Sequence, residues 1–183
     1  MAWQKTHKEQ SKDKILQSAA MLFTHHGFDK ISIDQVMNKA QMTRGAFYSH
    51  FHSKSDLYAQ AISKAADIAQ QRRPVNCPEN LTKIAEYYLS GKHRDENWQQ
   101  ACPLAFLVSD ISQQNAQVKS TYTQTFNNFI TLTEKLAANR EKALQSAVLM
   151  IGGLAIARAL DDKNLSDELL KACQQAIGKL ESN

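Results

Sequence analysis

Glycine, proline and cysteine are scarce in this chain of 183 residues, which has six, three and three of them. An all-β sandwich or barrel needs many turn residues, so the low glycine and proline contents argue against both folds. Three cysteines, an odd number, do not make a disulfide framework, which favours a reducing, cytoplasmic setting. A long apolar run is also missing, because only residues 147–157 are nearly apolar and a membrane-spanning helix needs about 20 such residues. We therefore expect a buried helix there and no membrane partner.

The composition is that of an ordinary globular protein, with 43% hydrophobic and 22% charged residues. The length is ample for one good core and short for two independent domains. The N-terminal segment MAWQKTHKEQSKDK is polar and no apolar run follows it, so we expect no secretory signal.

Positive charge is concentrated near the N-terminus. Residues 1–55 hold eight Lys and Arg against four Asp and Glu, whereas the rest of the chain holds fourteen of each class. Five of the six histidines also lie in residues 1–55. A basic face beside a compact motif suggests a polyanion partner, but an ordinary solvated surface also explains a net charge of +4. Charge alone does not decide between the two.

Apolar residues recur at helical spacing almost everywhere, which predicts an all-α fold of about nine helices. A first helix of about 18 residues should end at Gly27, and a short second helix should begin at Ser32, where Gln35 completes a capping box. Thr43 should cap a short third helix, and Ser53 a long fourth one. Further helices are expected over residues 79–90, 102–111, 115–138, 140–160 and 166–181, with a polar loop over 91–100.

The last two expected helices carry more apolar surface than they need to pack against each other. Gly152 and Gly153 would each cost about 1 kcal/mol in a helix relative to Ala, and the close approach of another helix would offset this. A partner subunit related by a two-fold axis is the simplest source of that helix, and the alternative is that both helices complete the core of the monomer. The candidate interface residues are Leu149, Gly152, Gly153, Ile156, Leu169, Cys173 and Ile177.

The second and third helices, with only Gln41 and Met42 between them and the first helix behind them, form a helix-turn-helix motif. In such a motif the second helix enters the major groove of DNA. Phe47 and Phe51 are four residues apart and can anchor this helix to its own core. Arg44 can then pair with guanine, the small residues at 45 and 46 allow a close approach, and polar side chains can donate to phosphates.

Residues 12–57 resemble the DNA-binding domain of the TetR (tetracycline-repressor-like) family of bacterial regulators. The resemblance includes the Gly-x-x-Tyr-x-His-Phe-x-x-Lys pattern that begins at Gly45. It implies a DNA-binding domain over residues 1–52 and an effector-binding and dimerisation domain over residues 53–183. Many members have glycine in the turn after the second helix where this chain has Gln41, so a positive φ there would cost about 1 kcal/mol. The expected DNA contacts are Ser32, Thr43, Arg44, Gly45, Ala46, Tyr48, Ser49, His50 and Lys54.

The same resemblance implies a homodimer on an inverted-repeat operator, released from duplex DNA by a small effector that the sequence does not identify. Repression is the family default. Candidate pocket residues, each of which could instead be an ordinary core residue, are Trp98, Cys102, Phe106, Tyr122, Phe126 and Phe129. Cys102 precedes Pro103 and should therefore cap a helix, where a thiol is more reactive. A thiol sensor and a small buried side chain are both open readings of Cys102.

Two other classes of protein are alternatives to a DNA-binding regulator. An enzyme is disfavoured because the sequence has no nucleophile-elbow, phosphate-loop or zinc-protease motif, so we expect no catalytic residue, metal site or cofactor. An all-α interaction module would bind duplex DNA no better than any basic surface does.

Overall fold

The computed structural model describes residues 2–71, 80–95 and 101–182. These residues form eleven helices and no strand, so the fold is all-α as expected. The chain divides into two compact units, residues 1–71 with 101–123, and residues 72–100 with 124–183. In chain order the helices are α1 (Ala2–His26), α2 (Ile33–Lys39), α3 (Arg44–Tyr48), α4 (Lys54–Gln71), α5 (Leu81–Tyr88), α6 (Gly91–Asp95), α7 (Pro103–Phe106), α8 (Val108–Ile111), α9 (Ala116–Glu134), α10 (Arg140–Ala159) and α11 (Lys163–Ser182).

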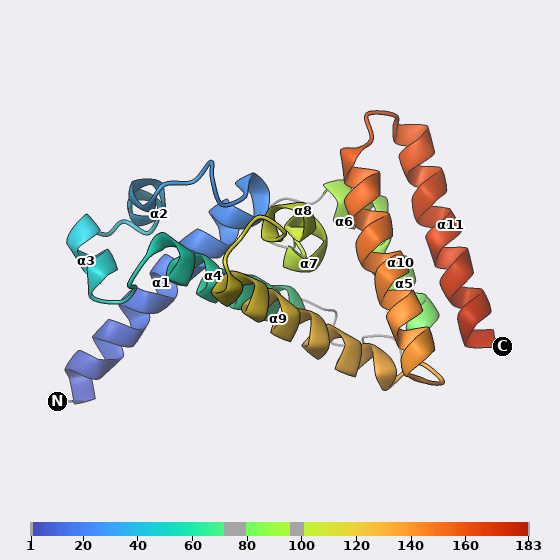
Figure 1. Cartoon of the computed structure of the whole chain (residues 1–183), viewed down its shortest axis with the longest axis horizontal. Helices are drawn as coiled ribbons and strands as arrows, with labels where there is room; N and C mark the ends of the chain where they lie inside the picture. The colour runs from blue at the N-terminus through green and yellow to red at the C-terminus, as the bar shows by residue number, and fades with distance from the viewer. Residues whose placement is uncertain (1, 72–79, 96–100, 183) are drawn as a thin grey trace. The chain divides into compact units, whose positions relative to one another are not determined.

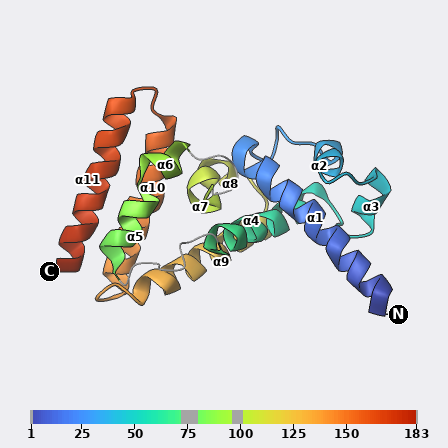
Figure 2. The ribbon, with the colours of Figure 1, turned by 180° about the vertical axis from the view of Figure 1, so that it is seen from behind.

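The first unit is built on α1, which packs against α4 and α2 (Figure 2). The apolar stripe of α1 predicted from the sequence is the part that enters the core, because Ile15 and Phe23 are fully buried. The capping box is present, since the Gln35 amide donates to Ser32 Oγ and the Ser32 amide donates to Gln35 Oε1. Ser53 accepts a hydrogen bond from the Asp56 amide at the start of α4.

Two turns of the first unit use positive φ angles, as the sequence suggests. Gly27 has φ 75° and follows the last residue of α1. Gln41 has φ 56° in the turn between α2 and α3, a conformation that costs a residue with a side chain about 1 kcal/mol. The Met42 amide donates to the Met37 carbonyl across this turn at 2.9 Å, and hydrogen bonds of this kind hold the conformation in place.

The second unit is organised by the antiparallel pair α10 and α11, with α5 against α11 (Figure 1). A Cβ atom at Gly153 would lie 2.8 Å from Cys173 Sγ and 3.2 Å from Leu89 Cδ2, so α10 can approach its neighbours only with glycine there. At Gly152 no atom of the chain lies within 4 Å of such a Cβ. Only Gly153 is therefore required for the packing of helices inside the subunit. Length and composition alone would let α10 cross a membrane, but the core helix of a soluble protein passes the same test.

Three segments differ from the sequence prediction. The first helix has 25 residues and begins at Ala2. Residues 91–95 of the expected loop form α6, because Ser90 caps this turn through the His93 amide and the side chains of His93 and Arg94 are buried. The expected helix over 102–111 is two short helices that meet at Leu107, whose φ of −112° and ψ of 2° are not helical.

Candidate nucleic-acid interface

The surface of α3 is set by two aromatic anchors on its other side. Phe47 and Phe51 are fully buried, and their ring centroids lie 5.6 Å apart. The sequence predicted both anchors. Because these rings hold α3 against the core of the first unit, the opposite face of this five-residue helix is left to solvent.

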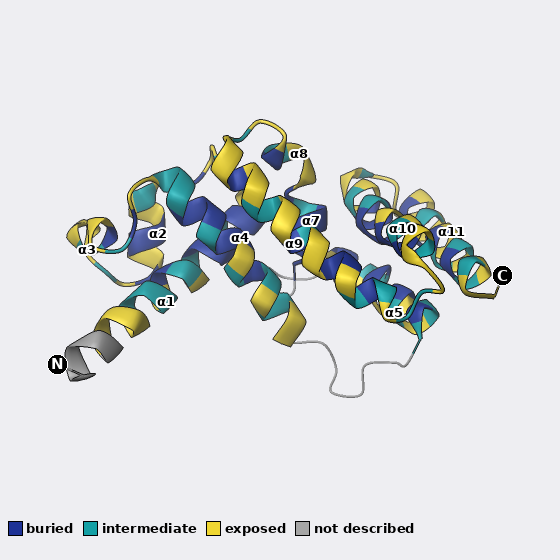
Figure 3. Cartoon of the chain, turned by 60° about the horizontal axis from the view of Figure 1, so that its bottom comes forward, coloured by how far each residue is buried: buried dark blue, intermediate teal, exposed yellow. Residues whose placement is uncertain are grey.

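The predicted base-reading residues lie on that open face. Thr43, Arg44 and Gly45 are exposed, as are Tyr48 and Ser49, while Ala46 and His50 are partly covered. Tyr48 is 63% exposed, an unusual position for a large aromatic side chain, and it packs only edge-on against Phe47. Figure 3 shows the exposed colour on α3. Thr43 begins the helix as expected, but its side chain accepts no capping hydrogen bond.

Arg44 has a partner that the sequence analysis missed. Its Nη1 lies 3.0 Å from Asp34 Oδ2, so an ion pair joins α3 to the first turn of α2. Both side chains are more than half exposed, and such pairs contribute only about 0–1 kcal/mol to stability. Arg44 can therefore leave Asp34 at little cost for a stronger partner such as a guanine edge. Ten residues separate Arg44 from Asp34, and only the geometry of the turn brings them together.

Lys54 stands at the N-terminus of α4 with its Nζ 4.1 Å from the centre of the Phe28 ring. Burial lowers the pKa of Lys54, and the carboxylates of Asp29 and Asp110 oppose this change. The ring holds the ammonium group at the first turn of α4. The positive end of the helix dipole lies at the same place, so both the ammonium group and the helix end favour the binding of an anion. Ser32, the remaining predicted contact, is exposed at the start of α2.

Known proteins resemble this chain both in sequence and in structure. The family model "Bacterial regulatory proteins, tetR family" matches residues 15–61. The chain is 28% identical to the Transposon Tn10 TetC protein of Escherichia coli over 160 residues, 84% of this chain and 80% of that protein. It is 32% identical to the negative transcriptional regulator IcaR of Staphylococcus aureus over 56 residues, 31% of this chain and 30% of IcaR. A TetR-family regulator from Cytophaga hutchinsonii has a similar structure, with a TM-score of 0.78 at 15% identity over 97% of this chain and 98% of that one.

The chain belongs to the TetR family of transcriptional regulators. The resemblance seen in the sequence is therefore confirmed, and the protein is a DNA-binding regulator with a helix-turn-helix. The family is one of transcriptional regulators and not of enzymes. Among the described residues, no three His, Cys, Asp or Glu side chains gather in a way that could hold a metal ion.

The predicted effector residues of this TetR-family regulator fall in both units. Cys102, Phe106 and Tyr122 belong to the first unit, Phe126 and Phe129 belong to the second, and Trp98 lies outside the described residues. An effector pocket formed by all of them stays a prediction. Cys102 does occupy the N-cap position of α7, before Pro103, but its side chain makes no capping hydrogen bond. Because α7 has only four residues, it can supply only a weak dipole to the thiol.

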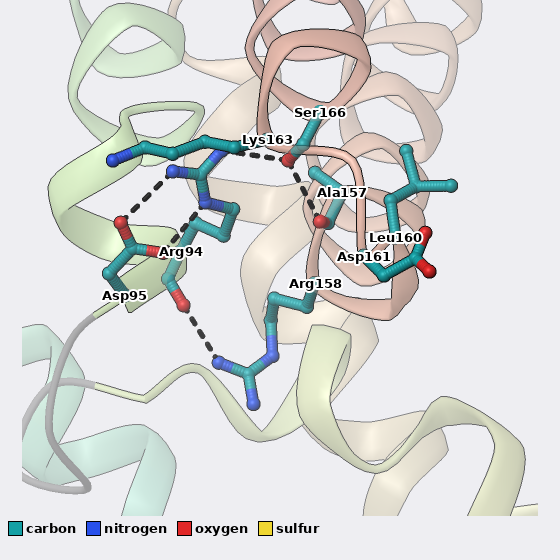
Figure 4. Close-up of a pocket in the computed structure, with 8 residues that line it drawn as sticks. All are labelled: Arg94, Asp95, Ala157, Arg158, Leu160, Asp161, Lys163 and Ser166. Atoms are coloured by element: carbon teal, nitrogen blue, oxygen red, sulfur yellow. Dashed lines mark hydrogen bonds and ion pairs between the residues drawn. The ribbon is translucent and has the colours of Figure 1, made fainter.

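The second unit has a surface pocket of about 370 Å³ where α6 meets the turn between α10 and α11 (Figure 4). None of the predicted effector residues lines it. Arg94 crosses the site, with Nε 2.7 Å from Asp95 Oδ1 and Nη1 2.6 Å from Asp167 Oδ1. Arg158 donates from Nη1 to the Arg94 carbonyl at 2.9 Å. The Arg94 guanidinium donates hydrogen bonds to Asp95, Ser166 and Asp167. Because Ser166 and Asp167 belong to α11, these bonds tie α6 to α11.

The predicted dimer residues divide into two groups. Gly153, Cys173 and Ile177 are buried within the second unit, because they fill the contact of α10 and α11 with each other and with α5. Leu149, Gly152 and Leu169 are partly open and Ile156 is 55% exposed. Val148, 63% exposed, and Leu165, 49% exposed, are further open apolar side chains of the same two helices that the sequence analysis did not single out. The spacing of four residues from Val148 to Gly152 to Ile156 is the sequence signal that could have found this face.

Proposed function

We propose that the protein is a homodimeric repressor that holds an inverted-repeat operator through α3 and leaves it when a small effector binds. The observation that carries the proposal is the anchoring of α3 by Phe47 and Phe51, which leaves polar and small side chains facing solvent. An exposed tyrosine beside an exposed arginine and a glycine suits the major groove, where a helix must come close to the base edges. We assign the protein to the cytoplasm, where an operator lies.

In this proposal the predicted contact residues have different roles. Arg44 leaves Asp34 and donates two hydrogen bonds to a guanine, which is the commonest specific contact in the major groove. Thr43, Gly45 and Ala46 let the backbone approach. Ser32, Tyr48, Ser49, His50 and Lys54 donate to phosphates and so fix the register of the helix.

Dimerisation is assigned to the open face of α10 and α11, which we call the apolar face: Val148, Gly152, Ile156, Leu165 and Leu169. Exposed aliphatic side chains at this spacing cost free energy in water, and a two-fold axis lets the face of one subunit cover that of the other. A two-fold dimer carries two copies of α3, and its operator is then an inverted repeat.

Selection of random duplexes by the purified full-length protein tests the proposal. The expected result is a single enriched motif with inverted-repeat symmetry whose half-sites lie one helical turn apart or a multiple of it. Enrichment of an unsymmetric motif would remove the dimer from the proposal. No enrichment at all would favour a protein-interaction module with a basic surface.

A further inference from the structure

The N-terminal part of α1 extends beyond the other helices of the first unit, on the side where α3 lies (Figures 1 and 2). Four residues of this helix, Lys8, Lys12, Ile15 and Ala19, are spaced four, three and four positions apart and therefore share one face. Ile15 and Ala19 are fully buried in the core, Lys12 is half-buried and Lys8 is exposed. The face that enters the core in the middle of α1 thus becomes cationic where the helix leaves it.

This cationic face reaches the end of α3. The Nζ of Lys12 lies 5.7 Å from the centre of the Phe51 ring, and Phe51 is one of the two anchors of α3. The His50 ring lies 6.1 Å from the same Phe51 ring. Burial and the positive charges of Lys8 and Lys12 lower the pKa of His50, which indicates that both lysines are near the imidazole. Two lysines of α1 and a histidine just after the end of α3 therefore share one region of the surface.

The carboxylates nearby do not neutralise this region. Asp13 is turned toward α4, with its Oδ1 2.6 Å from Lys64 Nζ and its Oδ2 accepting from Gln17. Glu9 is the other acid in this stretch, and in the part of α1 whose side chains are described no carboxylate lies within 4.0 Å of Lys8 or Lys12. Like charges held together on a rigid helix repel each other, and an anionic partner removes that repulsion.

We propose that Lys8 and Lys12 form a second phosphate-binding surface, which grips the DNA backbone next to the groove entered by α3. This inference rests on the proposed function and extends the interface from α3 and His50 to the first helix. The lysines bind the backbone without reading bases, so they add affinity and fix the angle of α3 in the groove. Each lysine that meets a phosphate releases about one counterion, which makes the contribution visible in the salt dependence of binding.

The experiment measures the affinity of the wild-type protein and of a Lys8→Gln, Lys12→Gln double variant for duplex DNA at several salt concentrations. We expect the slope of log K against log[salt] to become shallower by about 1.8, or roughly 0.9 for each lost contact. Near 0.1 M salt this corresponds to a loss of roughly tenfold for each lysine. The preferred sequence should stay the same, because no base contact is changed.

Lys14→Gln is the matched control. It removes the same charge from the same helix, but Lys14 is two residues beyond Lys12 and so lies about 200° around the helix. Its slope should equal that of the wild-type protein. An equal change in the control and the double variant would show a general charge effect and would overturn the inference. An unchanged slope in the double variant, with its circular-dichroism spectrum intact, would overturn it as well.

A duplex without the selected operator separates this inference from the proposed function. If the double variant has a shallower slope on both duplexes and the wild type prefers the operator, both proposals stand. If the wild type prefers no sequence but the double variant still has a shallower slope, the lysines bind phosphate and the operator proposal fails. If the wild type prefers the operator and the slopes are equal, the lysine surface alone is wrong.

Discussion

Tyr58 of α4 donates a hydrogen bond from its hydroxyl to Oδ2 of Asp110 in α8. The other carboxylate oxygen, Oδ1, accepts from the Phe28 amide at 3.2 Å, immediately after α1 ends. A Cβ atom at Gly27 would lie 3.0 Å from the same Oδ1, so the glycine leaves room for the carboxylate. The Asp110 side chain therefore ties α8 to the segment after α1 and to the second turn of α4. The Phe28 ring lies 5.2 Å from that of Tyr58 and beneath Lys54, so this tie also supports a proposed phosphate contact.

Replacing Asp110 should destabilise the first unit by more than the loss of one ordinary hydrogen bond. Asp110→Ala leaves both the Tyr58 hydroxyl and the Phe28 amide without their acceptor, at a cost of about 2–4 kcal/mol, whereas Tyr58→Phe should cost about 1–2 kcal/mol. Urea denaturation followed by circular dichroism gives both values. In the double variant the two costs should not add, because they share one bond. Strict additivity would show that the bond contributes nothing to stability.

Arg44→Ala should lower operator affinity by about 1–3 kcal/mol and relax the preference at one base position in each half-site. Asp34→Asn is its counterpart, because it frees the guanidinium from the ion pair and removes a negative charge from the surface that faces DNA. We expect Asp34→Asn to bind at least as tightly as the wild type, with the same base preference. Affinities for the operator and for duplexes changed at single positions give the comparison. A loss with Arg44→Ala that is equal for every sequence would make Arg44 a phosphate contact.

Much of the first unit is predictable because its signals are local. Ser32 and Gln35 cap each other three residues apart, Gly27 follows the end of a helix, and Phe47 and Phe51 are buried four residues apart. Side-chain contacts that depend on the tertiary fold have no such local signal in the sequence. Asp110 meets partners that are 52 and 82 residues away in the sequence, and the short α6 depends on the burial of Arg94 against Ser166 and Asp167. No pattern within a window of the sequence contains such pairs.

The apolar residues of α10 and α11 show a similar limit of the sequence analysis. The sequence pattern assigns the predicted interface to α10 and α11 but does not tell which faces of these two helices the subunit itself already covers. Gly153 and Cys173 are covered by the subunit itself, while Val148 and Leu165 are open. Both sets are apolar and recur at helical spacing, so only the packing of α10 against α11 and α5 tells them apart.

Two negative charges on the apolar face of each subunit should separate the subunits. Val148→Glu with Ile156→Glu would place two carboxylates where each subunit would cover the other, and we expect a monomer that binds the operator at least 100-fold more weakly, because it loses the second α3. Sedimentation equilibrium and operator binding measure the two effects. Lys171→Gln, on an exposed part of α11 outside this face, should remain a dimer. A double variant that stays dimeric would move the interface elsewhere.

Gly153→Ala should destabilise the second unit although alanine is the better helix former. The new Cβ would lie 2.8 Å from Cys173 Sγ, which is closer than real Cβ contacts allow, and overpacking of this kind costs about 1–3 kcal/mol. Cys173→Ala removes the obstructing sulfur and by itself leaves a small cavity. The two changes together should cost less than the sum of the single costs, because the methyl group added at position 153 takes up space that the removed sulfur vacates. Denaturation of all four proteins in urea tests this, and equal or greater than additive losses would contradict the packing argument.

Tyr122 should make the protein sensitive to alkaline conditions. Its hydroxyl donates to the Leu104 carbonyl at 2.6 Å, and burial, followed by the nearby Cys102, raises the pKa of Tyr122 from 10.0 to about 12. The unfolded chain loses this proton first, so the stability that Tyr122 contributes is fully present below pH 10 and is lost as the pH rises toward 12. Tyr122→Phe has no such proton to lose. We therefore expect the free energy of unfolding of the wild type to fall more steeply than that of Tyr122→Phe above pH 10, in urea denaturation at a series of pH values, and parallel curves would contradict the assignment.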